Sequence, residues 1–108
     1  MPRFLIIGSY SAEGARGVMS AGGSARRAAV EKAVTGLGGR VESFDFALGE
    51  EDIYTVVDMP DSESVTALAL TVNGSGAVRI RTVALMTAEQ VDRAAQLNPS
   101  YTPPGQTG

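Results

Sequence analysis

The feature that most constrains this chain is the stretch from residue 40 to residue 58, which is typical of a β-hairpin. Two runs of strand-forming residues are joined there by the short acidic turn Gly49-Glu50-Glu51-Asp52. An apolar run precedes the hairpin, and a helix-periodic segment lies on each side of it. The pattern predicts a mixed α and β architecture, and none of its residues forms a reactive constellation.

The N-terminal third predicts a strand, a loop and a helix. The apolar run Phe4-Leu5-Ile6-Ile7 is typical of a central strand that is covered on both faces. Glycines interrupt residues 11–23, so we expect a connecting loop with one helical turn there. Apolar residues at helical spacing predict a helix from about residue 25 to residue 37, with Ser24 as its N-cap.

The C-terminal half repeats the order of helix and strand. Asp61 is the predicted N-cap of a short, apolar helix that follows the hairpin. Residues 77–85 alternate between two faces and predict a fourth strand. Thr87 and Gln90 form a capping-box pattern that opens a last helix, and Asn98 precedes the proline that ends it.

The order β-α-β-β-α-β predicts an α+β fold of the ferredoxin-like type. In this arrangement a four-stranded antiparallel sheet carries two helices on one face, and here we expect a short C-terminal helix in addition. With 108 residues the chain suits one domain, which we place at residues 1–97. Residues 98–108 are rich in Pro, Gly and Thr and predict a flexible or partner-wrapping tail.

The first strand also predicts a homo-oligomer. Leu5 and Ile7 alternate with Phe4 and Ile6, so both of its sides are apolar and the sheet face away from the helices needs a cover. A second copy of the chain is the economical cover, as a dimer or a trimer-based assembly. Composition does not choose between these assemblies.

Composition excludes several classes of function. The 12 acidic residues exceed the 9 Lys and Arg, and a formal charge of −3 is not expected of a nucleic-acid binder. The chain has no Cys and no His, which removes thiolate and imidazole chemistry and leaves carboxylates, Tyr, Arg and Ser for any catalysis. We expect no cofactor and no metal. The N-terminal apolar run is too short for a signal peptide or a membrane span, so we expect no membrane partner and a cytoplasmic location.

Four segments carry a resemblance to a known family: residues 7–14, 25–27, 38–46 and 49–61. Over roughly residues 3–92 the chain resembles the GYD-domain family of small bacterial proteins. The resemblance implies a ferredoxin-like fold related to the dimeric α/β barrels, commonly oligomeric and without a settled activity. The chain departs from the family at Glu51, where an aromatic residue usually precedes the aspartate, so no role of that aromatic residue carries over.

Two groups of residues near the N-terminal half are candidate ligand sites. Around Ser24, Arg26 and Arg27 a glycine turn, a helix N-terminus and two guanidiniums suit an anion, although a capped helix with solvated arginines has the same pattern. The second group is formed by Ser9, Tyr10 and Glu13, at a place where a pocket between sheet and loop can open. Tyr54 could line that pocket, and Tyr10 as an ordinary core aromatic is the alternative.

Two further groups lie on the second half of the sheet. Glu50, Glu51 and Asp52 lie beside Asp45 and could bind a divalent cation or act as an acid–base pair, but a solvated hairpin tip is the favoured interpretation. Arg79 and Arg81 alternate on the fourth strand. They could clamp a carboxylate or phosphate, whereas an ion pair with Asp45 in the oligomer is the favoured alternative.

Two function classes follow. The first is a homo-oligomeric small-molecule-binding or regulatory and assembly module that takes a small organic or anionic ligand. The second is a cofactor-independent enzyme, monooxygenase-like or isomerase-like, that uses Tyr, Asp and Arg in an apolar cavity. The enzyme requires an enclosed cavity lined by Asp45, Tyr10, Tyr54 or Arg81. The lack of His and Cys favours the first class and leaves open whether the protein is catalytic.

Overall fold

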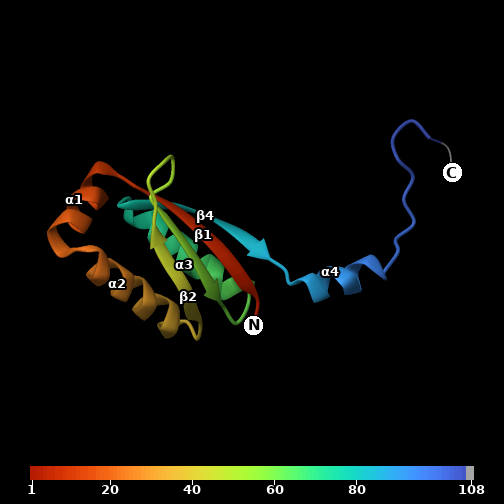
Figure 1. Ribbon diagram of the computed structural model, residues 1–108, viewed down its shortest axis with the longest axis horizontal. Coiled ribbons are helices and arrows are strands. Elements are labelled where there is room, and N and C mark those ends of the chain that lie inside the picture. The colour runs from red at the N-terminus through yellow and green to blue at the C-terminus, as the bar shows by residue number, and fades with distance from the viewer. Residues whose placement is uncertain (107–108) are drawn as a thin grey trace.

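A computed structural model describes residues 1–106 of the chain as eight helices and strands followed by a tail (Figure 1). They are β1 (Arg3–Tyr10), α1 (Ala12–Ala21), α2 (Gly23–Gly36), β2 (Arg40–Phe46), β3 (Ile53–Asp58), α3 (Ser62–Ser75), β4 (Val78–Leu85) and α4 (Ala88–Ala95). The predicted hairpin is confirmed as β2 and β3, and the four predicted strands are all present.

The four strands form one antiparallel sheet in the order β2-β3-β1-β4. The central strand β1 pairs with β3 on one side and with β4 on the other, so that Ile6 lies opposite Thr55 and Thr82. The register shifts between Val41 and Ser43 of β2. The protein is therefore an α+β domain with a four-stranded antiparallel sheet and four helices.

The prediction of a loop over residues 11–23 is wrong, because α1 is a helix of 10 residues. Ser11 caps it by accepting a hydrogen bond from the Gly14 amide, and the Ser11 amide donates to the Ala77 carbonyl at 3.0 Å. A Cβ atom at position 14 would overlap the Ala77 carbonyl oxygen. Glycine therefore lets α1 approach the start of β4, and this tertiary contact outweighs the low helix propensity of glycine.

Other helix boundaries also differ from the predictions. Ser24 was expected to be an N-cap but lies inside α2, whose N-cap is Gly22 with a φ of +92°. Asp61 is confirmed as the N-cap of α3, although that helix has 14 residues and is not short. The capping box at Thr87 and Gln90 is confirmed at the start of α4.

One apolar core joins the sheet to α2 and α3. Val34 of α2 packs in the same cluster as Val65 and Leu68 of α3. The sheet contributes Phe4, Ile6 and Val57, and the segment after β3 contributes Met59. Because side chains alternate along a strand, the register places Leu5, Ile7, Val56 and Val83 on the other sheet face, which we call the open face.

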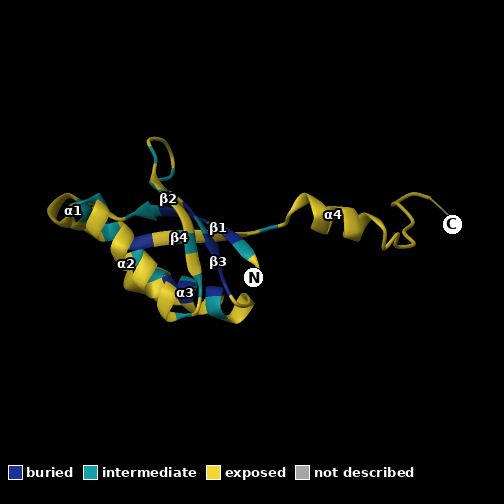
Figure 2. Cartoon of the chain, turned by 60° about the horizontal axis from the view of Figure 1, so that its bottom comes forward, coloured by how far each residue is buried: buried dark blue, intermediate teal, exposed yellow. Residues whose placement is uncertain are grey.

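The fourth helix lies away from the rest of the molecule. None of its residues is buried, and Figures 1 and 2 show α4 and the following tail extending beyond the end of β4. Residues 107 and 108 of the predicted tail lie outside the described residues. None of the helices within residues 1–106 is both long enough and apolar enough to cross a membrane.

Candidate functional site

A cavity of about 400 Å³ lies where α1 and the first half of α2 meet the end of β1 and the start of β4. Ligand cavities commonly measure about 300–1,000 Å³, so its volume suits a small organic molecule. Its lining residues are Tyr10 from β1, Glu13, Gly14, Gly17, Val18 and Ala21 from α1, Gly22, Ala25, Arg26 and Ala29 from α2, and Ala77 and Val78.

Small side chains create this space. Gly17 on α1 and Ala25 and Ala29 on α2 present at most one methyl group to the cavity. A Cβ atom added at Gly17 would meet no other atom within 4 Å. The space between α1 and α2 is therefore not filled by side chains, although the two helices follow each other directly through Gly22.

Two polar atoms in the cavity wall are buried without a hydrogen-bond partner among the described residues. They are the phenol oxygen of Tyr10 and the Nε atom of Arg26. The Arg26 guanidinium carbon lies 5.9 Å from the centroid of the Tyr10 ring, a cation–π arrangement that brings the two groups together. Buried polar groups are usually hydrogen-bonded, so two unpaired groups in one wall indicate a site for something outside this chain.

The N-terminus of α2 adds further donors to the same wall. Its N-cap, Gly22, makes no side-chain capping bond, and the helix lacks an acidic residue in its first turn. The first amides of a helix have no partner inside the helix, and the helix dipole makes this end attractive to negative charge. The cavity is thus lined by hydrogen-bond donors and by one guanidinium, with Glu13 as the only acidic lining residue.

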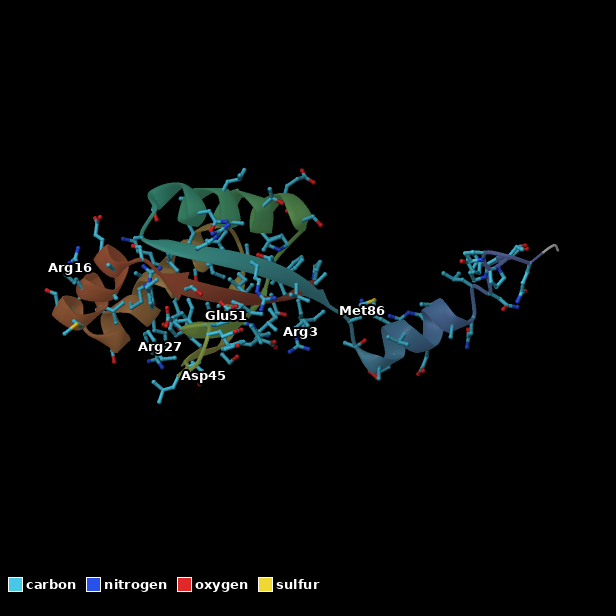
Figure 3. The ribbon with its side chains drawn as sticks, turned by 90° about the horizontal axis from the view of Figure 1, so that it is seen from above. Arg3, Arg16, Arg27, Asp45, Glu51 and Met86 are labelled. Atoms are coloured by element: carbon cyan, nitrogen blue, oxygen red, sulfur yellow. The ribbon has the colours of Figure 1, made fainter. Side chains whose placement is uncertain are left out.

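The predicted site residues are divided among three regions of the molecule. Tyr10, Glu13 and Arg26 come together at the cavity, whereas Ser24 does not line it. Arg27 lies 3.8 Å from Glu31 of the same helix and lines a separate shallow depression beside Phe44 and Phe46. Arg16 on α1 and Arg27 on α2 lie at the end of the molecule opposite Met86, so the arm formed by α4 does not reach the cavity (Figure 3).

Ser9 and Tyr54 do not line the cavity of about 400 Å³ with Tyr10, although Ser9 and Tyr10 both border a separate depression at the end of the sheet. Successive residues of a strand point to opposite sheet faces, so Ser9 lies on the open face. The register pairs Ile7 with Tyr54 and places Tyr54 on that face too. Asp45, opposite Tyr54, and Arg79 and Arg81 of β4 also lie there.

On the open face, Glu51 forms the centre of a small polar cluster. The Glu51 carboxylate accepts a hydrogen bond of 2.7 Å from the Ser9 hydroxyl and lies 3.3 Å from the Arg81 guanidinium. Within one chain the partner of Arg81 is therefore Glu51, and a pairing with Asp45 in an oligomer stays a prediction. Among residues 1–106 no three acidic side chains converge as a metal site would require.

The neighbouring Asp52 ties the hairpin turn to the cavity strand. Its carboxylate accepts a hydrogen bond of 2.8 Å from the Tyr10 amide, and its own amide donates to the Gly8 carbonyl. The acidic turn is therefore structural at Asp52 and paired at Glu51, rather than merely solvated. It holds the end of β1 from which Tyr10 enters the cavity.

A second, smaller space of about 120 Å³ adjoins the cavity, between α2, α3 and the sheet. Its lining is apolar, with Ile6, Leu68 and Ile80 among its residues. Its one buried hydroxyl, that of Thr55, already donates to the Ser43 carbonyl. Arg26, Ala29 and Val78 line both spaces, which makes Arg26 the boundary between a polar-walled cavity and an apolar slot.

Sequence reasoning missed most of the cavity wall. Gly17, Val18 and Ala21 belong to a segment that was expected to be a loop, and Ala77 and Val78 were assigned only to a strand. The useful signal is the spacing of small residues, because Gly14, Gly17 and Ala21 recur every three or four residues and so share one helix face.

The open space at Gly17 allows a stability prediction. Replacing Gly17 by alanine is expected to raise the free energy of unfolding by about 0.5–1 kcal/mol, because the methyl group meets no atom and alanine is the better helix former. Urea denaturation measures the change. Gly74→Ala in α3 is the matched control, since its methyl group also meets nothing and lies outside the cavity. A loss of stability in Gly17→Ala alone would contradict the open space described here.

The Glu51 cluster predicts a pH dependence. The Ser9 hydroxyl and then the Arg81 guanidinium hold the pKa of Glu51 below its ordinary value of 4.5, because both stabilise the ionised carboxylate. A carboxylate whose pKa is lower in the folded state than in the unfolded state stabilises the folded state at any pH above its ordinary pKa. This stabilisation is lost as the pH falls through the lower pKa of the folded state. An NMR titration of the Glu51 side-chain carboxyl is expected to give a midpoint below 4.5, and Ser9→Ala is expected to raise it. An unchanged midpoint in Ser9→Ala would contradict the assignment.

Comparison with known proteins connects this chain to one family. The family model described as the GYD domain matches residues 4–95, which includes all eight helices and strands almost completely. No match is found among curated proteins or among solved structures.

Proposed function

Since the chain belongs to the GYD domain family, we propose that it is a homo-oligomeric module that binds a small organic or anionic molecule in the cavity between α1, α2 and the sheet. The observation that carries this proposal is the pair of unpartnered buried atoms, Tyr10 Oη and Arg26 Nε. Leaving such groups unpaired costs stability, and a ligand that accepts from both would recover that cost. Binding of a ligand in this cavity would allow the ligand to control a regulatory function of the protein or its assembly.

The proposal includes a ferredoxin-like βαββαβ topology in which α1 is an additional helix before the first crossover. The strand order β2-β3-β1-β4 supports it, as does the single core that Val34 of α2 and Leu68 of α3 share with β1 and β3. Under this topology the open face is the surface that a second copy covers.

The open face supports self-association. Val83 is 40% exposed and Tyr54 is 39% exposed, and both lie in the middle of a face to which Leu5 and Val56 also contribute. At one end of this face Asp58 lies 2.7 Å from Arg40 and 3.9 Å from Arg3. Charged ends around an apolar centre suit an interface with a second copy of the chain, because homo-oligomers bury a self-complementary patch.

The arm formed by α4 is consistent with the same assembly. A helix of 8 residues is too short to be stable by itself in water, and α4 has no buried residue within its own chain. Val91 is 50% exposed on it. A neighbouring copy would provide the apolar contact that this helix lacks.

The enzyme alternative has less support. It required Asp45, Tyr10, Tyr54 or Arg81 around one enclosed cavity, and the register divides them between the two sides of the sheet. Only Tyr10 of these four lines the cavity of about 400 Å³. The geometry therefore favours binding over catalysis.

Native mass spectrometry of the purified protein tests both parts of the proposal. We expect a defined oligomer, and a small molecule carried through purification would appear as a reproducible added mass. Val83→Glu on the open face is expected to lower the oligomer population at least about tenfold, because it buries an unpaired charge in the interface. Leu70→Glu, on an exposed position of α3, is the matched control and should leave the assembly intact. A monomeric wild-type protein would refute the homo-oligomer.

A further inference from the structure

We propose that the ligand of the cavity is an organic carboxylate whose charged end meets Arg26 and Tyr10 and whose apolar body enters the slot between α2 and α3. The inference rests on the proposed binding function and adds the chemical class of the ligand. It depends on three features: the donors, the net charge of the wall and the position of the slot.

The unpartnered groups select a hydrogen-bond acceptor. Arg26 Nε carries a hydrogen and can only donate, and the Tyr10 hydroxyl is also free to donate. The Gly22 amide already donates to the Val18 carbonyl, but the first amides of α2 have no partner inside the helix, and that of the lining residue Ala25 adds a donor. A ligand group with several acceptor lone pairs satisfies this set, whereas an ammonium group would meet only donors.

The charges of the cavity wall favour a ligand that carries a single negative charge. Arg26 forms no ion pair in the part of the chain that the structure describes, so its charge is available to a ligand. It is the only cationic residue that lines the cavity, and the exposed Glu13 at the wall opposes a second negative charge. One guanidinium with an acidic neighbour suits a carboxylate better than a doubly charged phosphate monoester.

The position of Arg26 indicates that the part of the ligand attached to the carboxylate is apolar. Arg26, Ala29 and Val78 line both the cavity and the slot, so a carboxylate held at Arg26 lies next to the slot of about 120 Å³. Ile6, Leu68 and Ile80 give the slot an apolar wall, and the Thr55 hydroxyl there is already bonded. Each further CH₂ group buried in this slot is therefore expected to tighten binding about fourfold.

The test uses linear saturated carboxylates of increasing chain length, each compared with the primary alcohol and the primary amine of the same length. Binding is followed by isothermal titration calorimetry and by the Arg26 Nε–H signal in ¹⁵N NMR spectra. We expect each carboxylate to bind at least about tenfold more tightly than its alcohol and amine, since charge-assisted hydrogen bonds are about twice as strong as neutral ones. Affinity should rise with chain length until the slot is full.

Adjacent arginines provide a matched pair of variants. Arg26→Met keeps the side chain as far as the position of Nε but removes the donors and the charge, and it is expected to weaken carboxylate binding about tenfold or more. Arg27→Met changes the next residue of the same helix, whose side chain lines a different depression, and should alter binding less than about twofold. Glu13→Gln is expected to tighten binding, because it removes the opposing charge from the wall. If Arg26→Met does not fold, Tyr10→Phe tests the second donor and should weaken binding by several-fold.

The outcomes separate this inference from the proposed function. Equal binding of carboxylates and alcohols, or equal losses in Arg26→Met and Arg27→Met, would overturn the carboxylate assignment. If only a neutral or cationic small molecule shifts the amide signals of Gly17 and Ala25, the cavity binds ligands and the carboxylate class is wrong. If no small molecule shifts those signals and native mass spectra show no adduct, both proposals fail.

Discussion

Replacing Met59 by alanine is expected to lower the free energy of unfolding by about 2–5 kcal/mol. Met59 is fully buried, packs in the cluster that joins the sheet to α2 and α3, and follows directly after β3. Truncation removes the transfer free energy of its side chain and leaves a cavity that fully buried neighbours such as Val34 and Val57 cannot fill without moving. Domains of this size are stable by only about 5–15 kcal/mol, so the variant would lose a large part of its stability.

Urea denaturation, with thermal unfolding as a second readout, measures this effect. For a domain of about this size the loss corresponds to a fall in Tm of at least about 10 °C. Met86→Ala is the matched control, because Met86 is 66% exposed at the start of the arm and its loss should cost less than about 0.5 kcal/mol. Met59→Leu conserves volume and should cost less than about 1.5 kcal/mol. Equal effects of the two alanine substitutions would refute the assignment of Met59 to the core.

The sheet could be predicted from sequence because its signals are local. Alternation over residues 77–85 and the turn at Gly49 to Asp52 identify β4 and the hairpin without reference to any other part of the chain. The N-caps Asp61 and Thr87 could be predicted for the same reason, because each side chain accepts a hydrogen bond from the amide three residues later. Each of these features is fixed by residues that lie close together in the sequence.

The helix α1 was missed because its stability is not local. Its glycines at positions 14 and 17 lower helix propensity, and this cost is visible in the sequence. The compensating contact with Ala77 joins residues more than sixty positions apart and appears only in the folded chain. Without α1 the sequence provided no second wall for a cavity, so Arg26 and Tyr10 were assigned to different candidate sites.

The absence of Ser9 from the cavity that Tyr10 lines has a reason that the sequence does contain. Neighbouring residues on a strand point to opposite faces, so the cavity on the helix side that Tyr10 lines does not include Ser9 once β1 extends to residue 10. The apolar run ends at Ile7, and Ser9 and Tyr10 were expected to lie where the strand enters a loop. The longer strand delivers the Tyr10 phenol to the helix side and the Ser9 hydroxyl to Glu51 on the open face.

The other large effect is expected from Gly14→Ala. Its Cβ atom would overlap the backbone carbonyl oxygen of Ala77, which also accepts hydrogen bonds from the Ser11 amide and hydroxyl. A flexible side chain can relieve such an overlap by changing its rotamer, but a backbone carbonyl cannot. The helix α1 must therefore move away from β4. We expect a loss of about 1–3 kcal/mol in the free energy of unfolding, despite the higher helix propensity of alanine.

The comparison with Gly17→Ala makes this prediction specific. Both substitutions add one methyl group to the same helix, both positions line the cavity, and only position 14 faces backbone. Denaturation in urea should therefore give changes of opposite sign for the two variants. The displacement of α1 also moves one wall of the cavity away from Arg26. Gly14→Ala should therefore lower the affinity for a ligand, although the Arg26 side chain itself is unchanged. If both variants are stabilised equally, α1 does not rest on the start of β4, and the cavity between them loses its structural basis.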